Sequence, residues 1–133
     1  MALLDRDELN NRLREFDELK ARIAQHPRKE DEHYLVCEAH VQQLEGFLKD
    51  AHIRVNDIEE SQTVVASLTH LKADLAAGGG ESEQMAQCEQ LLQVARKRLG
   101  DAEDKVVSLR ALIGHYLAEA MTEFDESMAS DRT

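Results

Sequence analysis

The chain has 133 residues, of which 27 are acidic and 16 are basic, so its formal net charge at pH 7 is -11. This charge repels nucleic-acid phosphates, and no stretch combines Lys and Arg with aromatic residues, so we do not expect a nucleic-acid partner. One proline, six glycines and no tryptophan are typical of an all-helical protein. The acidic start and the lack of a long apolar stretch predict a cytoplasmic protein without membrane insertion.

The first predicted helix covers about residues 5–25. Asp5 can cap its start, with Glu8 three residues later. Its apolar residues recur on one face, which predicts that this face packs against the rest of the protein. They are Leu9, Leu13, Phe16, Leu19 and Ile23. The helix should end at His26-Pro27, because a proline disfavours helical geometry in the residue before it.

Two longer segments flank three consecutive glycines, and in both the apolar residues recur at alternating steps of three and four. Before the glycines they are Tyr34, Cys37, Val41, Leu44, Leu48, Ala51, Val55, Ile58 and Val65, with Gln62 as the one polar member. After the glycines they are Met85, Cys88, Leu92, Ala95, Leu99, Ala102, Val106, Leu109, Ile113, Tyr116 and Ala120. This repeat predicts helices at about 29–77 and 82–127 that pack along a narrow seam, with a turn at 78–80.

These elements together predict an all-α fold and one domain over 1–133. It is a long antiparallel, coiled-coil-like hairpin with the shorter N-terminal helix on its terminal half, three helices in total. If the chain folds back at the glycines, residues whose numbers add up to 157 face each other, for example Leu44 and Ile113. The same register brings Glu45 near Arg110 on one flank, where opposite charges help to set orientation.

No pattern predicts an enzyme. Cys37 and Cys88 lie near opposite ends of the predicted hairpin, too far apart for a disulfide, so we expect two reduced thiols in the seam. The glycines at Gly78-Gly80 are not a phosphate loop, because no lysine follows them and their neighbours are acidic. Ser, His and Asp residues occur, but none in a recognisable catalytic setting.

More apolar residues surround the turn than a two-helix seam can bury. We predict that they bind a partner: Val64, Val65, Leu68, Leu71 and Leu75 before the glycines, and Met85, Leu91 and Leu92 after them, with Val94 nearby. A contiguous exposed apolar surface usually marks an interface. A second copy of the chain can cover it as a homodimer and form a four-helix bundle. Alternatively, an amphipathic helix of another protein binds there, and the acidic surroundings then favour a basic one.

A metal site is the alternative that the histidines raise. Glu30 precedes His33 by three residues, the spacing that carboxylate-bridged di-iron bundles use. The hairpin register places His33 beside Glu126 and His40 beside Glu119. The candidate ligands for iron or zinc are therefore Glu30, His33, His40 and Glu119. A second motif of this kind is missing, and partly solvated His/Glu pairs are the simpler interpretation, with no cofactor.

The sequence thus predicts a non-enzymatic helical-hairpin module for protein interaction, such as an adaptor, an assembly factor or a small acidic chaperone. We expect it to oligomerise and to bind a partner helix through the apolar face near Gly78-Gly80. The two alternatives are a ferritin-like metal-carboxylate protein and a structural coiled-coil spacer.

Overall fold

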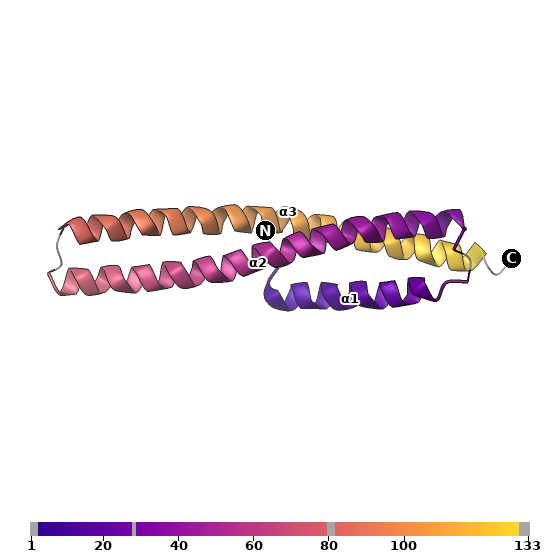
Figure 1. The fold of residues 1–133 in the computed structure, drawn as a ribbon, viewed down its shortest axis with the longest axis horizontal. Coiled ribbons are helices and arrows are strands. Elements are labelled where there is room, and N and C mark those ends of the chain that lie inside the picture. Colours follow the sequence, from indigo (N-terminus) through magenta and orange to yellow (C-terminus); the bar gives the residue numbers. More distant parts are fainter. Residues whose placement is uncertain (1–2, 28, 80–81, 131–133) are drawn as a thin grey trace. The chain divides into compact units, whose positions relative to one another are not determined.

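The computed structural model describes residues 3–27, 29–79 and 82–130, and these residues form three helices and no strand. The helices are α1 (Arg6–Ala24), α2 (Glu32–Ala77) and α3 (Ser82–Ser130) (Figure 1). The two long helices pack extensively against each other, and the shorter N-terminal helix completes a bundle of three. The predicted fold class is confirmed.

The helix boundaries differ from the predicted ones by a few residues. α2 begins at Glu32, where the backbone carbonyl of Asp31 accepts the first helical hydrogen bond from the Leu35 amide at 3.0 Å. α3 continues to Ser130, beyond the predicted end at 127. Gly78 and Gly79 form the predicted turn, whereas Gly80 lies outside the described residues. Gly79 has a φ of 70°, a left-handed conformation that glycine adopts without the steric cost of a Cβ atom.

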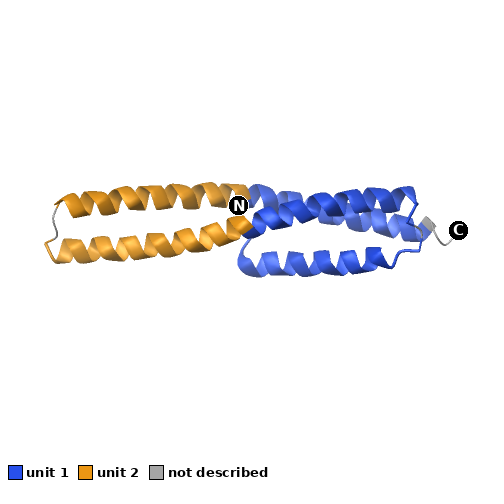
Figure 2. Ribbon diagram, viewed as in Figure 1, with its two compact units in different colours: residues 1–52, 106–133 blue, residues 53–105 orange. Residues whose placement is uncertain are grey.

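The chain divides into two compact units, shown in blue and orange in Figure 2. Unit 1 comprises residues 1–52 and 106–133 and contains α1, the first part of α2 and the last part of α3. Unit 2 comprises residues 53–105 and contains the remaining parts of α2 and α3 with the turn between them. One folding domain over 1–133 stays a prediction.

Unit 1 has a core to which all three of its helices contribute. The start of α1 is capped by the Asp5 side chain, which accepts a hydrogen bond from the Glu8 amide at 2.7 Å. The Cys37 thiol donates to the carbonyl of Ala120 at 3.1 Å, and this contact agrees with the predicted register. The buried apolar residues of unit 1 are Leu4, Leu9, Phe16, Leu19, Ile23, Tyr34, Cys37, Val41, Leu44, Leu48, Ala51, Val106, Leu109, Ile113, Leu117, Ala120 and Phe124.

The predicted pair of Glu45 and Arg110 was wrong. Arg110 instead binds the Glu8 carboxylate of α1 at 2.8 Å, and Glu45 pairs with Lys49 at 3.4 Å. The prediction considered only the two long helices. α1 presents a carboxylate that Arg110 reaches in good hydrogen-bond geometry, so the arginine joins α3 to α1 instead of to α2.

Unit 2 buries a single seam between its two helices. Its buried residues are Val55, Ile58, Ser61, Cys88, Leu92, Ala95 and Ala102. The prediction that Gln62 enters the seam was wrong, because Ser61 is buried and Gln62 is exposed. The buried residues Val55, Ile58 and Ser61 follow one another at two steps of three residues. Two such steps in succession, in place of a step of three and one of four, overwind a packed helix locally. Beyond it, Lys72 rather than Leu71 turns toward the seam.

Candidate functional site

Unit 2 exposes large apolar side chains on both of its helices. Val64 and Leu71 of α2 are 42% and 48% exposed, and Leu91 and Val94 of α3 are 56% and 67% exposed. Two packed helices can bury only the strip along which they touch. Apolar residues beside that strip therefore stay in contact with water, as the sequence led us to expect for this region.

Three of these side chains line a groove of about 440 Å³ between the two helices of unit 2, which we call the apolar groove. Its complete lining is Glu60, Ser61, Thr63, Val64, Ser67, Leu68, Leu91, Val94, Ala95 and Arg98. Leu68 and Ala95 form its deeper part, because Leu68 is half-buried and Ala95 is buried. Polar groups at the rim and an apolar centre are the arrangement of a protein-binding surface.

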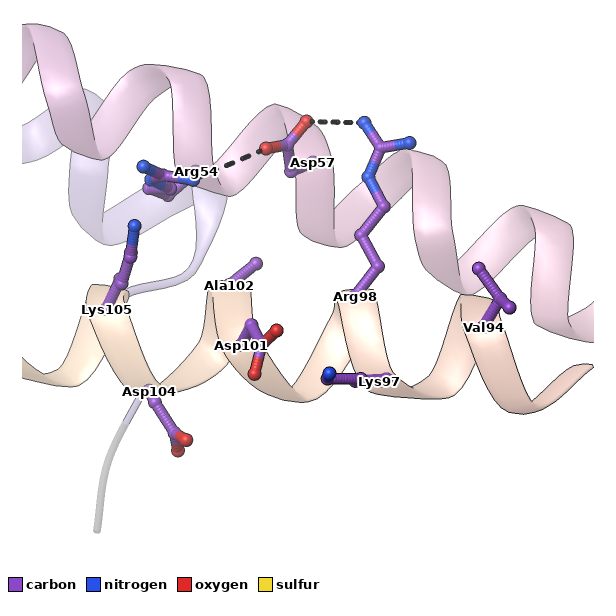
Figure 3. A pocket seen from close by; sticks show the side chains of 9 residues that line it. All are labelled: Arg54, Asp57, Val94, Lys97, Arg98, Asp101, Ala102, Asp104 and Lys105. Carbon is purple, nitrogen blue, oxygen red and sulfur yellow. Dashed lines mark hydrogen bonds and ion pairs between the residues drawn. The ribbon is translucent and has the colours of Figure 1, made fainter.

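A second hollow of about 750 Å³ lies in unit 2 and shares Val94 and Arg98 with the apolar groove. We call it the charged hollow, and Figure 3 shows its lining residues: Arg54, Asp57, Val94, Lys97, Arg98, Asp101, Ala102, Asp104 and Lys105. Asp57 accepts a hydrogen bond from Arg98 at 3.3 Å and forms an ion pair with Arg54 at 3.9 Å. In Figure 3, Asp104 points away from α2, whereas Lys105 extends toward it.

The charged hollow differs from the chain as a whole. Four basic and three acidic residues line it, although the chain carries a net charge of -11. The expectation that acidic surroundings favour a basic partner concerned the apolar residues around the turn, and it stays a prediction. Two of the basic side chains, Arg54 and Arg98, are paired with Asp57, and the charged residues of the hollow have a formal sum of +1.

The predicted partner-binding residues fall into three groups. Val64, Leu68 and Leu91 line the apolar groove. Leu71 is exposed on α2 outside that lining. The remaining four, which belong to the seam or border it, are the buried Leu92 and the half-buried Val65, Leu75 and Met85. Val94 is the most exposed apolar residue of the groove, and it joins the groove to the charged hollow.

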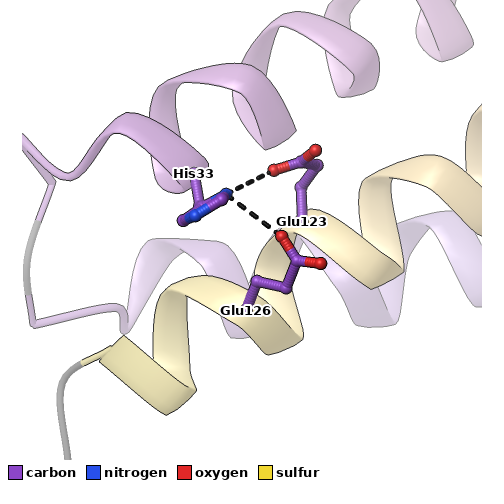
Figure 4. A group of neighbouring side chains, drawn as sticks. All are labelled: His33, Glu123 and Glu126. Atoms are coloured by element: carbon purple, nitrogen blue, oxygen red, sulfur yellow. Dashed lines mark hydrogen bonds and ion pairs between the residues drawn. The ribbon is translucent and has the colours of Figure 1, made fainter. Parts of the chain in front are cut away.

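In unit 1, His33 meets two glutamates of α3, as Figure 4 shows. Its Nδ1 atom lies 2.8 Å from Oε2 of Glu123 and 3.2 Å from Oε2 of Glu126. The hydrogen bond with Glu123 is the main reason why the pKa of His33 is raised. These three side chains, called the His33 cluster below, place possible metal-ligand atoms within 4.8 Å of one another.

The other predicted metal ligands do not join this cluster. Among the described residues, His33, Glu123 and Glu126 are the one group of three such ligands, so Glu30, His40 and Glu119 are outside it. The His40 ring instead contacts the Tyr116 ring, with centroids 5.6 Å apart. Glu30 and Glu119 are exposed. The predicted register placed Glu126 beside His33, which the structure confirms, and missed Glu123, one turn earlier on α3.

A buried polar cluster that sequence reasoning missed links α3 to the segment between α1 and α2. The Ser127 hydroxyl donates a hydrogen bond to Oδ2 of Asp31 at 2.5 Å and lies 2.7 Å from Nε2 of His26. Because the single hydroxyl proton goes to Asp31, Nε2 of His26 donates to the serine oxygen. Histidine here does not act as a base toward the serine. In the sequence, the one signal for this cluster was the His26-Pro27 pair just before the start of a helix.

Burial also keeps the cysteine of unit 1 unreactive. Cys37 and Cys88 are both free and buried. Burial raises the pKa of the Cys37 thiol to about 11, so the nucleophilic thiolate is scarce at neutral pH. A catalytic cysteine, in contrast, lies in an electropositive environment that is accessible to solvent.

Comparison of the chain with known protein families, with curated proteins and with solved structures finds no match. Within the described residues, no helix has the length and apolar character needed to cross a membrane.

Proposed function

We propose that the chain is a non-enzymatic helical-hairpin interaction module, and that the apolar groove of unit 2 binds an amphipathic helix of a partner protein. The observation that carries this proposal is the continuous exposure of Val64, Leu91 and Val94 along a groove between two helices. A helix laid into an apolar groove is a common mode of peptide recognition. Adaptors, assembly factors and small chaperones are the functional classes that use such a surface.

The apolar part of the groove supports affinity. Leu91 and Val94 each leave more than half of their side chain in water. Covering such a side chain contributes on the order of 1 kcal/mol, because complete burial of a Val or Leu is worth about 1.5–3 kcal/mol. Side chains of the partner that enter the groove gain similarly, so a few apolar anchors spaced along one helix face are sufficient for specific binding.

The charged hollow supports a choice of partner chemistry and orientation. It continues from the apolar groove through Val94 and Arg98, and Lys97 and Lys105 add positive charge. A partner helix with apolar residues at one end and carboxylates at the other matches both parts. The groove thus favours an acidic-ended amphipathic helix, with the carboxylates over Arg98.

A second copy of the chain is the other candidate occupant, and the size of the face favours it. Each helix segment of unit 2 has about 24 residues and extends roughly 36 Å. At the usual spacing of packed helices, a two-helix face has an area of roughly 650 Å². Two such faces approach the area of a standard protein interface. A homodimer of this kind is a four-helix bundle.

Site-specific photocrosslinking distinguishes these occupants. A photoreactive amino acid at position 94 should crosslink, in the native host, to one abundant partner protein, within a segment that has acidic residues next to an apolar helix face. The matched control is position 93, because Gln93 is exposed on the neighbouring position of α3 and does not line the groove.

Each outcome decides between the candidates. A crosslink to a second copy of the chain assigns the face to a homodimer. Equal crosslinking from positions 93 and 94, or no crosslink from either, refutes the groove as a binding surface and leaves a structural spacer. Val94→Gln should abolish the specific crosslinked complex when the probe is at position 91, because burying an amide without hydrogen-bond partners opposes binding.

A further inference from the structure

The His33 cluster combines one nitrogen and two oxygen ligands from two helices of unit 1. His33 lies in the first turn of α2, and Glu123 and Glu126 are three residues apart on one face of α3. The side chains of His33 and Glu123 are 41% and 22% exposed, so the cluster is open to solvent on one side. An ion can therefore enter without any movement of the helices.

We propose that the His33 cluster is a Zn²⁺ site, with His33, Glu123 and Glu126 as the protein ligands and water in the remaining position. This inference goes beyond the proposed function, because it concerns unit 1 and does not depend on the groove of unit 2. Of the ligands expected from the sequence it keeps His33, and it replaces the others by Glu123 and Glu126, which the structure brings together with His33.

The distances fit a shared ion. Zn²⁺ binds imidazole nitrogen at about 2.0–2.1 Å and carboxylate oxygen at about 2.0–2.2 Å, so two ligands of a tetrahedral ion lie about 3.4 Å apart. The Nδ1 atom of His33 is 2.8 Å from Glu123 and 3.2 Å from Glu126. Small rotations of the two glutamate side chains, which are 22% and 53% exposed, therefore place three ligand atoms around one ion. Three protein ligands with an open position are a common zinc arrangement.

The charge of the cluster also favours a divalent cation. Glu123 and Glu126 form their ion pairs with His33 and with no Lys or Arg in the part of the chain that the structure describes. Two carboxylates with one imidazolium leave a net charge of about -1, whereas Zn²⁺ with a neutral imidazole balances both carboxylates. Asp31 lies close enough to act electrostatically on His33, and it adds to the negative field that attracts a cation.

The ligand types select among divalent ions. An imidazole nitrogen suits Zn²⁺ and other transition-metal ions, whereas Mg²⁺ prefers oxygen ligands and near-ideal octahedral geometry. If the cluster were only an acidic surface, Mg²⁺ and Zn²⁺ would bind alike. A preference for Zn²⁺ that depends on His33 is therefore the specific signature of the site.

Calorimetric titration of the untagged chain at neutral pH, in a buffer that does not bind metals, tests the proposal. ZnCl₂ should bind with one ion per chain, and MgCl₂ should not compete. His33→Ala, and separately Glu123→Gln combined with Glu126→Gln, should weaken Zn²⁺ binding at least about tenfold, because even residues outside the ligand shell often change metal affinity by that factor.

Matched controls remove the same charge or the same residue type elsewhere in unit 1. Glu38→Gln with Glu119→Gln neutralises two exposed carboxylates, and His115→Ala removes an exposed histidine. Both should bind Zn²⁺ as the parent chain does. Circular dichroism without metal verifies that each variant is folded, and Zn²⁺ should raise the melting temperature of the parent and control chains alone.

The proposal is overturned by absence of saturable binding, by equal losses in the control variants, or by unchanged Zn²⁺ binding after the changes to His33, Glu123 and Glu126. Binding of Mg²⁺ as tight as that of Zn²⁺ overturns it as well, since that result identifies a diffuse acidic surface. None of these results bears on the groove, which lies in the other unit and is tested by crosslinking.

Discussion

Units 1 and 2 are built from the same two long helices but bury their side chains to different degrees. Leu9, Cys37 and Leu44 are among several residues of unit 1 that are completely buried. In unit 2, even the least exposed residues, such as Leu92, retain some contact with water. The difference is due to α1, which covers a flank in unit 1 that remains open in unit 2. A heptad repeat therefore specifies a hairpin, while a third helix decides whether its flank is core or binding surface.

The largest difference should appear when one leucine is shortened in each unit. Leu44→Ala should lower the free energy of unfolding by about 3–4 kcal/mol and Leu92→Ala by about 2 kcal/mol, because the cost depends on how far the surroundings can close the cavity. Three helices hold the cavity around residue 44 open, whereas the two-helix seam can relax or admit water. Urea unfolding of both variants measures this, and equal costs would contradict the comparison.

The buried polar cluster of unit 1 has no counterpart among the described residues of unit 2. Ser127→Ala should reduce the free energy of unfolding by about 2 kcal/mol, because it leaves the buried His26 and the carboxylate of Asp31 without this partner. Ser67→Ala in the apolar groove is the control and should change stability little, since Ser67 is exposed. If the two serines behave alike in urea unfolding, the cluster does not stabilise unit 1.

The two cysteines report how easily each unit opens. Both thiols are buried, so alkylation under native conditions requires local unfolding. Cys88 in the two-helix unit should be alkylated at least about tenfold faster than Cys37, since fewer contacts oppose its opening. Single-cysteine variants, Cys37→Ala and Cys88→Ala, allow each rate to be followed by mass spectrometry. Faster modification of Cys37 would reverse the order of stability that burial indicates.

Alkaline pH should destabilise the chain through the core of unit 1. Burial raises the pKa of Cys37 from 9.0 to about 11, so the folded state holds the thiol proton more tightly than the unfolded state. Its contribution to stability is complete below pH 9 and is lost as the pH rises toward 11, by at most about 1.4 kcal/mol per pH unit. Urea unfolding across this range should show a shallower decline in Cys37→Ala than in Cys88→Ala. Equal slopes would contradict the burial effect.

The smallest effect on stability is expected at the surface of unit 2. Leu91→Gln and Val94→Gln should each change the free energy of unfolding of the isolated chain by less than about 0.5 kcal/mol, since both side chains are already largely in water. The same changes should abolish partner binding or self-association in light scattering. If either substitution strongly lowers the free energy of unfolding of the monomeric chain, the residue belongs to a core and not to a binding surface.

Most of the fold followed from the spacing of the apolar residues. Apolar residues that recur at alternating steps of three and four predict long helices packed along a seam, and few other structures fit this repeat. Details that depend on side-chain geometry did not follow. Ser61 and Gln62 are neighbours, and which of them is buried depends on local winding of α2, which residue types alone do not specify. The register correctly placed Glu126 beside His33, but it did not include Glu123, which lies one turn earlier on the same face of α3 and is the nearer partner.

The sequence predicted the location of the apolar groove better than the residues that line it. Counting apolar residues shows that the region near the turn has a surplus, and Val64, Leu68 and Leu91 do line the groove. The sequence assigned Leu92 both to the seam and to the binding surface, and its burial shows that it belongs to the seam. The charged hollow was not foreseen, because its residues are spread over both helices and their charges nearly cancel in the sequence.

The depth of Ser127 has a practical consequence for shortened recombinant versions of the protein. Phe124 and Ser127 are both buried, and the hydroxyl of Ser127 holds the link between α1 and α2. A stop codon placed after residue 127 keeps both buried residues, while one placed a few codons earlier deletes interior packing. The last turns of α3 are therefore needed for the packing of unit 1, and a reporter protein should be fused after them.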